Sequence, residues 1–152
     1  ITNGSTGKWL AINGLANTFE IKNAKNRLTY QFQTGIEMKA PAANTPQSVT
    51  FTCGIFRNSR LVAVRPDKIT SNNSADKEGF QDYIFTLNYT EQNVPVGTQK
   101  IEVACRKMES SNANTLFTIG RNINNSNTIS NAFTQESDLK VDVIEYVTYQ
   151  TN

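Results

Sequence analysis

The chain has 152 residues and a net charge of +2, and only 18% of its residues are charged. This balance gives no electrostatic reason to expect nucleic acid or an acidic membrane as a partner, and no apolar run is long enough to span a bilayer. The sequence has no histidine, which removes the commonest general base and the commonest metal ligand.

Two short strands are predicted near the start of the chain. Apolar residues recur from Lys8 to Ile12 and from Thr18 to Ile21, and Asn13-Gly14 lies between the two runs. The chain opens at Ile1 without a signal-like apolar region. We therefore expect residues 1–152 to form a single domain cut from a longer protein.

Residues 27–39 carry the strongest strand signal. Polar residues occupy one parity of this segment, and the other parity is apolar at Leu28, Tyr30, Phe32, Ile36 and Met38. Alternation with a period of two predicts a long strand with one buried face and one solvated face. A helix would scatter the same residues around its circumference.

The alternation recurs along the rest of the chain. It predicts a hairpin over 49–65 with its turn at residues 57–60, and further strands over 83–89, 101–105, 116–119 and 139–149. About eight or nine strands result, with no helix. Strands at this spacing, separated by turns, indicate an all-β antiparallel sandwich or barrel.

Few residues are candidates for catalysis or metal binding. Cys53 and Cys105 lie in alternating apolar sets, so we expect them to point inward, as a disulfide or as two buried thiols. Ser and Lys form no nucleophile motif. The densest acidic cluster matches no calcium loop and favours an ordinary solvated loop: Asp76, Glu78 and Asp82. We predict no enzyme activity, no metal and no cofactor.

Two long polar segments, residues 67–81 and 109–131, interrupt the pattern and are predicted to be exposed loops. Loops at the end of a rigid sandwich commonly carry contacts to partners. We therefore place candidate ligand contacts in Ser71 to Gly79 and Ser110 to Asn131. The candidate residues are Asn72, Asn73, Asp76, Asn122, Asn124, Asn125 and Asn127.

Three predicted strands are apolar on both faces. Val62 and Val64 show this in the strand over 61–64, and the other cases are the strand over 82–89 and the terminal strand. A strand of a monomeric sandwich normally keeps one solvated face. Burial against another chain and burial under a loop both explain the pattern. The candidate oligomer-interface residues are Ile84, Ile144 and Tyr146.

The order of five segments resembles a known family. The segments are 9–19 (Trp-Leu-Ala-Ile-Asn-Gly-Leu-Ala-Asn-Thr-Phe), the long strand 28–38, residues 48–58, residues 94–105 with Val-Pro-Val-Gly-Thr, and the closing strand 139–146. Together they resemble the C-terminal jelly-roll heads of bacteriophage tail fibres, tail spikes and head fibres. Those heads are similar to the tumour-necrosis-factor and complement heads.

The resemblance implies a jelly-roll β-sandwich that is the head of a longer fibre or spike protein. It further implies a non-catalytic, homotrimeric receptor-binding or fibre-tip domain on the virion, or otherwise secreted. The implied partner is a host-surface polysaccharide or protein, with no nucleic acid and no membrane insertion. Two alternatives stay open: a monomeric carbohydrate-binding module of a secreted polysaccharidase, and a purely structural trimerisation head.

Overall fold

The computed structural model describes residues 8–120 and 137–147. This part of the chain contains eight strands and no helix: β1 (Leu10–Ile21), β2 (Asn26–Ala40), β3 (Ser48–Arg57), β4 (Arg60–Thr70), β5 (Gly79–Gln92), β6 (Gly97–Ser110), β7 (Leu116–Ile119) and β8 (Asp138–Glu145). Within these ranges no helix has the length and apolarity needed to cross a membrane.

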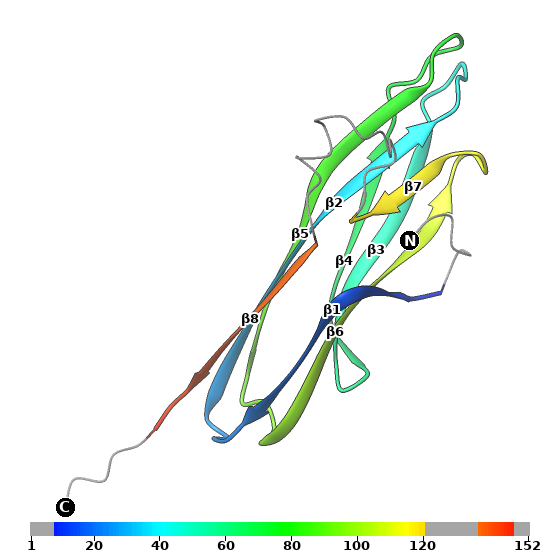
Figure 1. Ribbon diagram of the computed structural model, residues 1–152. Helices are drawn as coiled ribbons and strands as arrows, with labels where there is room; N and C mark the ends of the chain where they lie inside the picture. Colours follow the sequence, from blue (N-terminus) through cyan, green and yellow to red (C-terminus); the bar gives the residue numbers. More distant parts are fainter. Residues whose placement is uncertain (1–7, 121–136, 148–152) are drawn as a thin grey trace, which may run out of the picture.

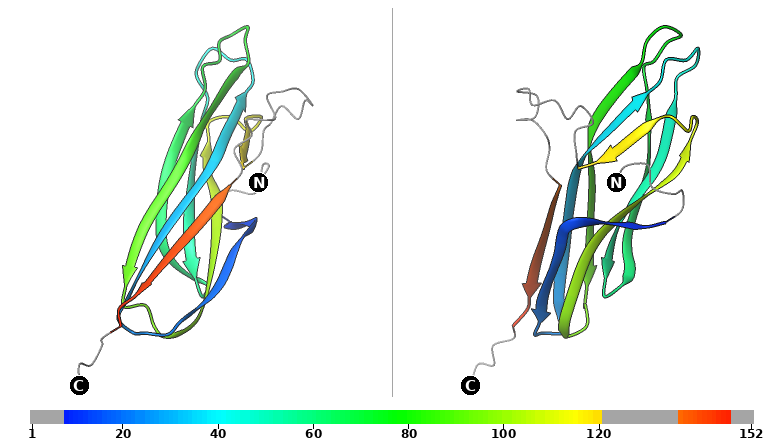
Figure 2. Two further views of the ribbon diagram at one scale, coloured as in Figure 1. Left: turned by 60° about the vertical axis from the view of Figure 1, so that its left-hand side comes forward. Right: turned by 45° about the vertical axis from the view of Figure 1, so that its right-hand side comes forward.

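The strands form two antiparallel sheets that pack face to face (Figure 1). Sheet A has the order β1-β6-β3-β4. Sheet B is built around β2, with β5 on one side. On its other side β2 pairs with β8 along residues 26–33 and with β7 along residues 36–39. The strands run along the length of an elongated sandwich, as the two views of Figure 2 show. The predicted all-β, antiparallel sandwich is confirmed.

The strand pairs nest inside one another. β3 pairs with β4 at the centre of the sequence, β2 pairs with β5 outside them, and β1 pairs with β6 outside those. β7 and β8 extend this arrangement by adding to the free side of β2. The jelly-roll assignment is finer than the two-sheet description and stays a prediction.

Strand β2 supplies one wall of the core. The strand predicted over 27–39 is confirmed: its even-numbered residues from 26 to 40 are all buried, and the intervening ones are exposed or half-buried. Opposite them, sheet A contributes Phe51, whose ring centroid lies 5.5 Å from that of Phe85 and 5.0 Å from that of Phe117. Burial of such rings is the main stabilising term of a sandwich core.

The predicted hairpin over 49–65 is confirmed as β3 and β4. Its turn residues Asn58 and Ser59 have φ angles of 49° and 65°, a conformation with two positive φ values that suits the twist of a two-residue hairpin. The Asn58 side chain accepts a hydrogen bond from the Lys100 backbone N–H at 2.8 Å. This contact ties the turn to the neighbouring strand β6.

The prediction of two strands around Asn13-Gly14 is wrong. β1 is one strand that pairs with β6 from Leu10↔Cys105 to Ile21↔Gly97, and its register shifts between Ala11 and Ala16. Gly14 has a φ of +84°, so Asn13-Gly14 belongs to an irregular bulge rather than to a hairpin turn.

The first predicted loop is shorter than expected, and the second starts later than expected. β4 continues through Thr70 and β5 starts at Gly79, so only residues 71–78 connect them. In the same way β6 continues to Ser110. Polar residues of edge strand β4, such as Lys68, face solvent while still pairing with β3, and they therefore give no hydrophobic strand signal.

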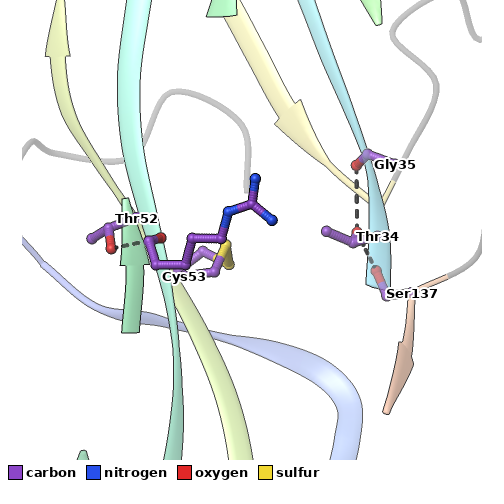
Figure 3. Close-up of a disulfide and its surroundings, with 7 residues drawn as sticks. Thr34, Gly35, Thr52, Cys53 and Ser137 are labelled. Carbon is purple, nitrogen blue, oxygen red and sulfur yellow. Dashed lines mark hydrogen bonds between the residues drawn. A yellow bond between two sulfur atoms is a disulfide. The ribbon is translucent and has the colours of Figure 1, made fainter. Parts of the chain in front are cut away.

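Cys53 and Cys105 form a disulfide between adjacent strands (Figure 3). They are direct register partners of β3 and β6, with a Cα–Cα distance of 4.0 Å, and both are fully buried. The inward orientation predicted for both cysteines is confirmed. Of the two states left open, the structure has the bonded one.

Candidate interaction surfaces

Three connections meet at one end of the sandwich: residues 41–47, 71–78 and 111–115 (Figure 1). The Gln47 backbone N–H donates to Ser71 Oγ at 3.0 Å and to Asn73 Oδ1 at 3.0 Å. The Ser111 hydroxyl donates to Gln47 Oε1 at 2.9 Å. These hydrogen bonds join the three connections into one loop end.

Asn73 does not have the exposed position predicted for it. Its side chain is 7% exposed, and Nδ2 donates to the carbonyls of Ala43 and Thr45 at 3.1 and 3.0 Å. The Ser71 hydroxyl also donates to Asn73 Oδ1. This amide is used to hold the loop end together, because buried polar atoms need partners.

The other predicted ligand contacts divide into two groups. Asn72 and Asp76 are exposed at the loop end, although Asn72 Oδ1 accepts a hydrogen bond from the Phe80 backbone N–H at 3.2 Å. The remaining candidates lie outside the described residues: Asn122, Asn124, Asn125 and Asn127.

The acidic cluster lies beside the loop end. Glu78 forms an ion pair with Lys39 at 2.7 Å, and Asp82 belongs to β5. Within 8–120 and 137–147, no three His, Cys, Asp or Glu side chains are grouped so that they could hold a metal ion.

The predicted interface residues are exposed but do not form one surface. Ile84 is the register partner of Gly35, and Ile144 is the partner of Arg27. Both isoleucines are on the outer face of sheet B. They are eight residues apart along β2, which corresponds to roughly 27 Å. Tyr146 follows β8, where its backbone N–H donates to Lys25 O at 2.9 Å.

An apolar surface that was not predicted as a unit occupies part of the outer face of sheet A; at its border Glu102, the register partner of Phe56, forms an ion pair with Lys100 at 2.9 Å. Register places Val64, Gly54, Ala104 and Ala11 in one row across all four strands. Large side chains surround the row. We call this surface the Trp9 patch and define it as Trp9, Ala11, Gly54, Phe56, Leu61, Val64 and Ala104.

The aromatic rings of the Trp9 patch are in contact with each other and with Arg106 at its edge. The Trp9 and Phe56 ring centroids are 5.1 Å apart in an edge-to-face arrangement, and the Arg106 guanidinium lies 4.9 Å from the Trp9 ring. Leu61 is 40% exposed and Val64 51% exposed. Exposed apolar residues that adjoin in this way are typical of an interaction surface, whereas single ones are ordinary.

The middle of the outer face of sheet B, between Ile84 and Ile144, has the opposite character. Three rows cross β8, β2 and β5: Asp142–Thr29–Thr90, Lys140–Gln31–Asn88 and Asp138–Gln33–Thr86. We call the six uncharged residues from β2 and β5 the polar ladder: Thr29, Gln31, Gln33, Thr86, Asn88 and Thr90. Five of the six are exposed, and Thr29 is half-buried.

The titratable cluster in the interior is structural. Arg57 Nε and Nη2 donate to the two Glu91 carboxylate oxygens at 3.1 and 3.2 Å, and the Tyr30 hydroxyl donates to Glu91 Oε2 at 2.7 Å. Burial, followed by the Glu91 hydrogen bond, raises the pKa of Tyr30 well above its ordinary value. Both charged groups of the cluster are paired with each other. The cluster therefore joins the two sheets and leaves no unpaired charged group for chemistry.

A cavity of about 300 Å³ lies between the β1 bulge and the end of β7. Its polar wall includes Asn13 and Ser137, and the Ser137 hydroxyl lies 2.7 Å from the Thr34 hydroxyl (Figure 3). Neither a carboxylate nor a lysine is among the lining residues. The described wall therefore offers Ser137 no general base.

No family model matches the chain, and a search of curated proteins finds no similar sequence.

Proposed function

We propose that this chain is a non-catalytic head domain of a phage fibre or spike, which assembles as a homotrimer and attaches to a host-surface glycan or protein. The proposed location is the virion, or otherwise outside the cell. The observation that carries the assembly part is the Trp9 patch, because its apolar row crosses all four strands of sheet A. The trimeric number and the phage source come from the sequence resemblance.

The chemistry of the Trp9 patch supports contact with another protein chain. Interface cores are enriched in aromatic residues and arginine and depleted of other charged residues. Trp9, Phe56 and Arg106 meet this description on a sheet face whose centre has only small side chains, at Gly54 and Ala104. A second chain would bury Leu61 and Val64, which are exposed here.

A binding role also agrees with the chemistry of the described residues. The ion pair of Arg57 and Glu91 is used in packing, and the described residues that line the cavity beside Ser137 include no base. The disulfide of Cys53 and Cys105 supports a protein that matures outside a reducing cytosol, since such bonds persist on secreted and virion surfaces.

The carbohydrate-binding-module alternative receives less support. Such a module needs a row of exposed aromatic rings on one sheet or in one cleft. In the described part of the chain only Tyr89 and Tyr146 are exposed aromatic residues, and they belong to different segments.

Sedimentation of Leu61→Asp tests the assembly role. A carboxylate at this position would be buried without a partner in the assembled state, so we expect the variant to dissociate to the monomer while staying folded. Val96→Asp is the matched control, because Val96 is an exposed valine in a turn outside the Trp9 patch. Unchanged assembly of Leu61→Asp would show that the patch is not the interface.

A further inference from the structure

The polar ladder carries hydrogen-bonding groups that the fold does not use. The side-chain amides of Gln31, Gln33 and Asn88 are exposed, and none of them hydrogen-bonds to another residue of the described ranges. The threonines are partly engaged: Thr29 Oγ1 lies 3.4 Å from Thr90 Oγ1, and Thr86 Oγ1 accepts from Arg65 at 3.5 Å. As far as residues 8–120 and 137–147 are concerned, the three amides are therefore available to bind something outside the chain.

The arrangement of the amides is regular. Gln31 and Asn88 are direct register partners on adjacent strands, and Gln33 is in the next row of the same face. Adjacent strands lie about 4.8 Å apart, and successive residues on one face of a strand are about 6.8 Å apart. The amides thus form an array over two successive rows on the outer face of β2 and β5.

The composition of the array selects the kind of ligand. Each amide has both a hydrogen-bond donor and an acceptor. It is therefore complementary to a hydroxyl group, which can also donate and accept a hydrogen bond. The six residues carry no charge. On the adjoining β8, Lys140 pairs with Asp142 at 3.0 Å, and Asp138 adds a carboxylate beside Gln33. Arg27 lies one row beyond the ladder on the same face of β2. An anionic ligand would find no free cation in the ladder. A protein partner would find no apolar anchor among these six residues.

We propose that the polar ladder binds a neutral, polyhydroxylated chain, an uncharged polysaccharide, that lies along β2 and β5. This inference rests on the proposed attachment role and assigns its contact surface and ligand class. It places attachment on sheet B and assembly on sheet A, so the two roles use opposite faces of the sandwich.

Native gel electrophoresis through soluble polysaccharides tests this assignment. The neutral probes are dextran, mannan and galactan, and alginate is the acidic probe. We expect at least one neutral probe to retard the whole chain. The double variant Gln31→Ala/Asn88→Ala should bind that probe roughly tenfold more weakly, from the loss of two hydrogen-bonding side chains. Asn17→Ala is the control, because Asn17 is an exposed strand amide on sheet A.

Each outcome decides one point. Retardation by alginate alone, no retardation by any neutral probe, or equal retardation of the double variant and the wild type would overturn the assignment. Sedimentation of the same samples separates this inference from the proposed assembly. A monomer that binds a neutral probe through the ladder would contradict the trimer and leave the ladder assignment standing. A trimer that binds no neutral probe would contradict the ladder assignment and leave the trimer standing.

Discussion

Gly54 shows how one residue determines the outer face of sheet A. A Cβ atom at this position would lie 2.6 Å from Leu61 Cδ1, 3.1 Å from the Ala63 carbonyl oxygen and 3.1 Å from the Trp9 ring. The end of the leucine side chain can move, whereas the backbone oxygen cannot do so without shifting β4. The absence of a side chain at Gly54 thus lets Trp9 and Leu61 pack onto the sheet.

We predict that Gly54→Ala lowers the free energy of unfolding by about 1–3 kcal/mol, the usual cost of overpacking. Urea unfolding measures this cost. The fluorescence of Trp9, the single tryptophan of the chain, should change in the folded state because its ring is displaced. The double variant Gly54→Ala/Leu61→Ala should recover part of the loss, and a fully additive double variant would show that Leu61 is not the obstacle.

A second prediction for single residues concerns the stability of Arg57 and Glu91 variants. The two side chains are only 14% and 16% exposed, so removing one partner leaves the other charge poorly solvated. Arg57→Met should lower the free energy of unfolding by about 3 kcal/mol, measured by urea unfolding. Arg57→Met/Glu91→Leu should lose much less, since neither charge remains. If the double variant were as unstable as the single one, packing rather than charge would explain the loss.

Single residues also show where sequence reasoning reaches its limit. The inward orientation of Cys53 and Cys105 follows from alternation, and it is confirmed. The burial of Asn73 could not be predicted in that way. Its partners are the carbonyls of Ala43 and Thr45, which are about thirty residues away in the chain and come close only after both sheets have formed. Nothing in a polar loop sequence distinguishes an amide that binds a partner from one that satisfies buried carbonyls.

At the scale of elements, β8 is joined to the rest of the molecule by a specific contact at its end. Glu145 Oε1 accepts hydrogen bonds from the backbone N–H groups of Asn23 and Lys22, at 3.0 and 2.5 Å. The Asn23 side chain in turn donates to Tyr146 O at 2.7 Å. The end of β8 is thereby tied to the turn between β1 and β2.

This contact predicts a pH dependence. The two N–H groups, that of Asn23 foremost, lower the pKa of Glu145 below its ordinary value. The ionised form therefore stabilises the docked end above the unfolded-state pKa of about 4.3, and this contribution is lost as the pH falls through the lower, folded-state pKa. Amide exchange of Asn23 and Lys22, corrected for intrinsic rates, should speed up in acid. Glu145→Gln should exchange faster at neutral pH and respond less to acid; an unchanged pH response would contradict this role.

The disulfide connects β3 and β6, the two central strands of sheet A. Its cysteines are 52 residues apart in the chain. Closing a loop of this length restricts the unfolded chain, and the chain-entropy relation gives about 4 kcal/mol. Cys53→Ala/Cys105→Ala should therefore lower the free energy of unfolding by about 2–4 kcal/mol in urea titrations. Reducing agent should destabilise the wild type and leave the variant unchanged; a wild type that is insensitive to reduction in the unfolded state would contradict the bond.

The elements also differ in how well the sequence predicts them. β2 is easy to predict because one face is buried over its whole length, from Leu28 to Met38, and alternation reports that burial directly. β1 is harder, because the sequence Asn13-Gly14 suits both a hairpin turn and a bulge. Only the pairing with β6 along its whole length decides between them. The end of β4 and the start of β5 are also hard to predict from the sequence, because edge-strand residues near solvent are polar.

At the scale of the whole molecule, the two outer faces of the sandwich have contrasting chemistry. The face of sheet A has an apolar row bordered by Trp9 and Leu61, and the face of sheet B carries the uncharged polar ladder. The sequence shows that β4 is apolar on both faces. It does not show that the apolar row continues across β3, β6 and β1, because Gly54, Ala104 and Ala11 become neighbours only through the order of the strands.

Sedimentation equilibrium of the wild-type domain at micromolar concentration shows whether copies of the chain meet on sheet A. We expect a particle of three times the chain mass of 16.9 kDa for the wild type, and a folded monomer for Leu61→Asp. A wild-type domain that stays at 16.9 kDa up to the highest soluble concentration would contradict this expectation.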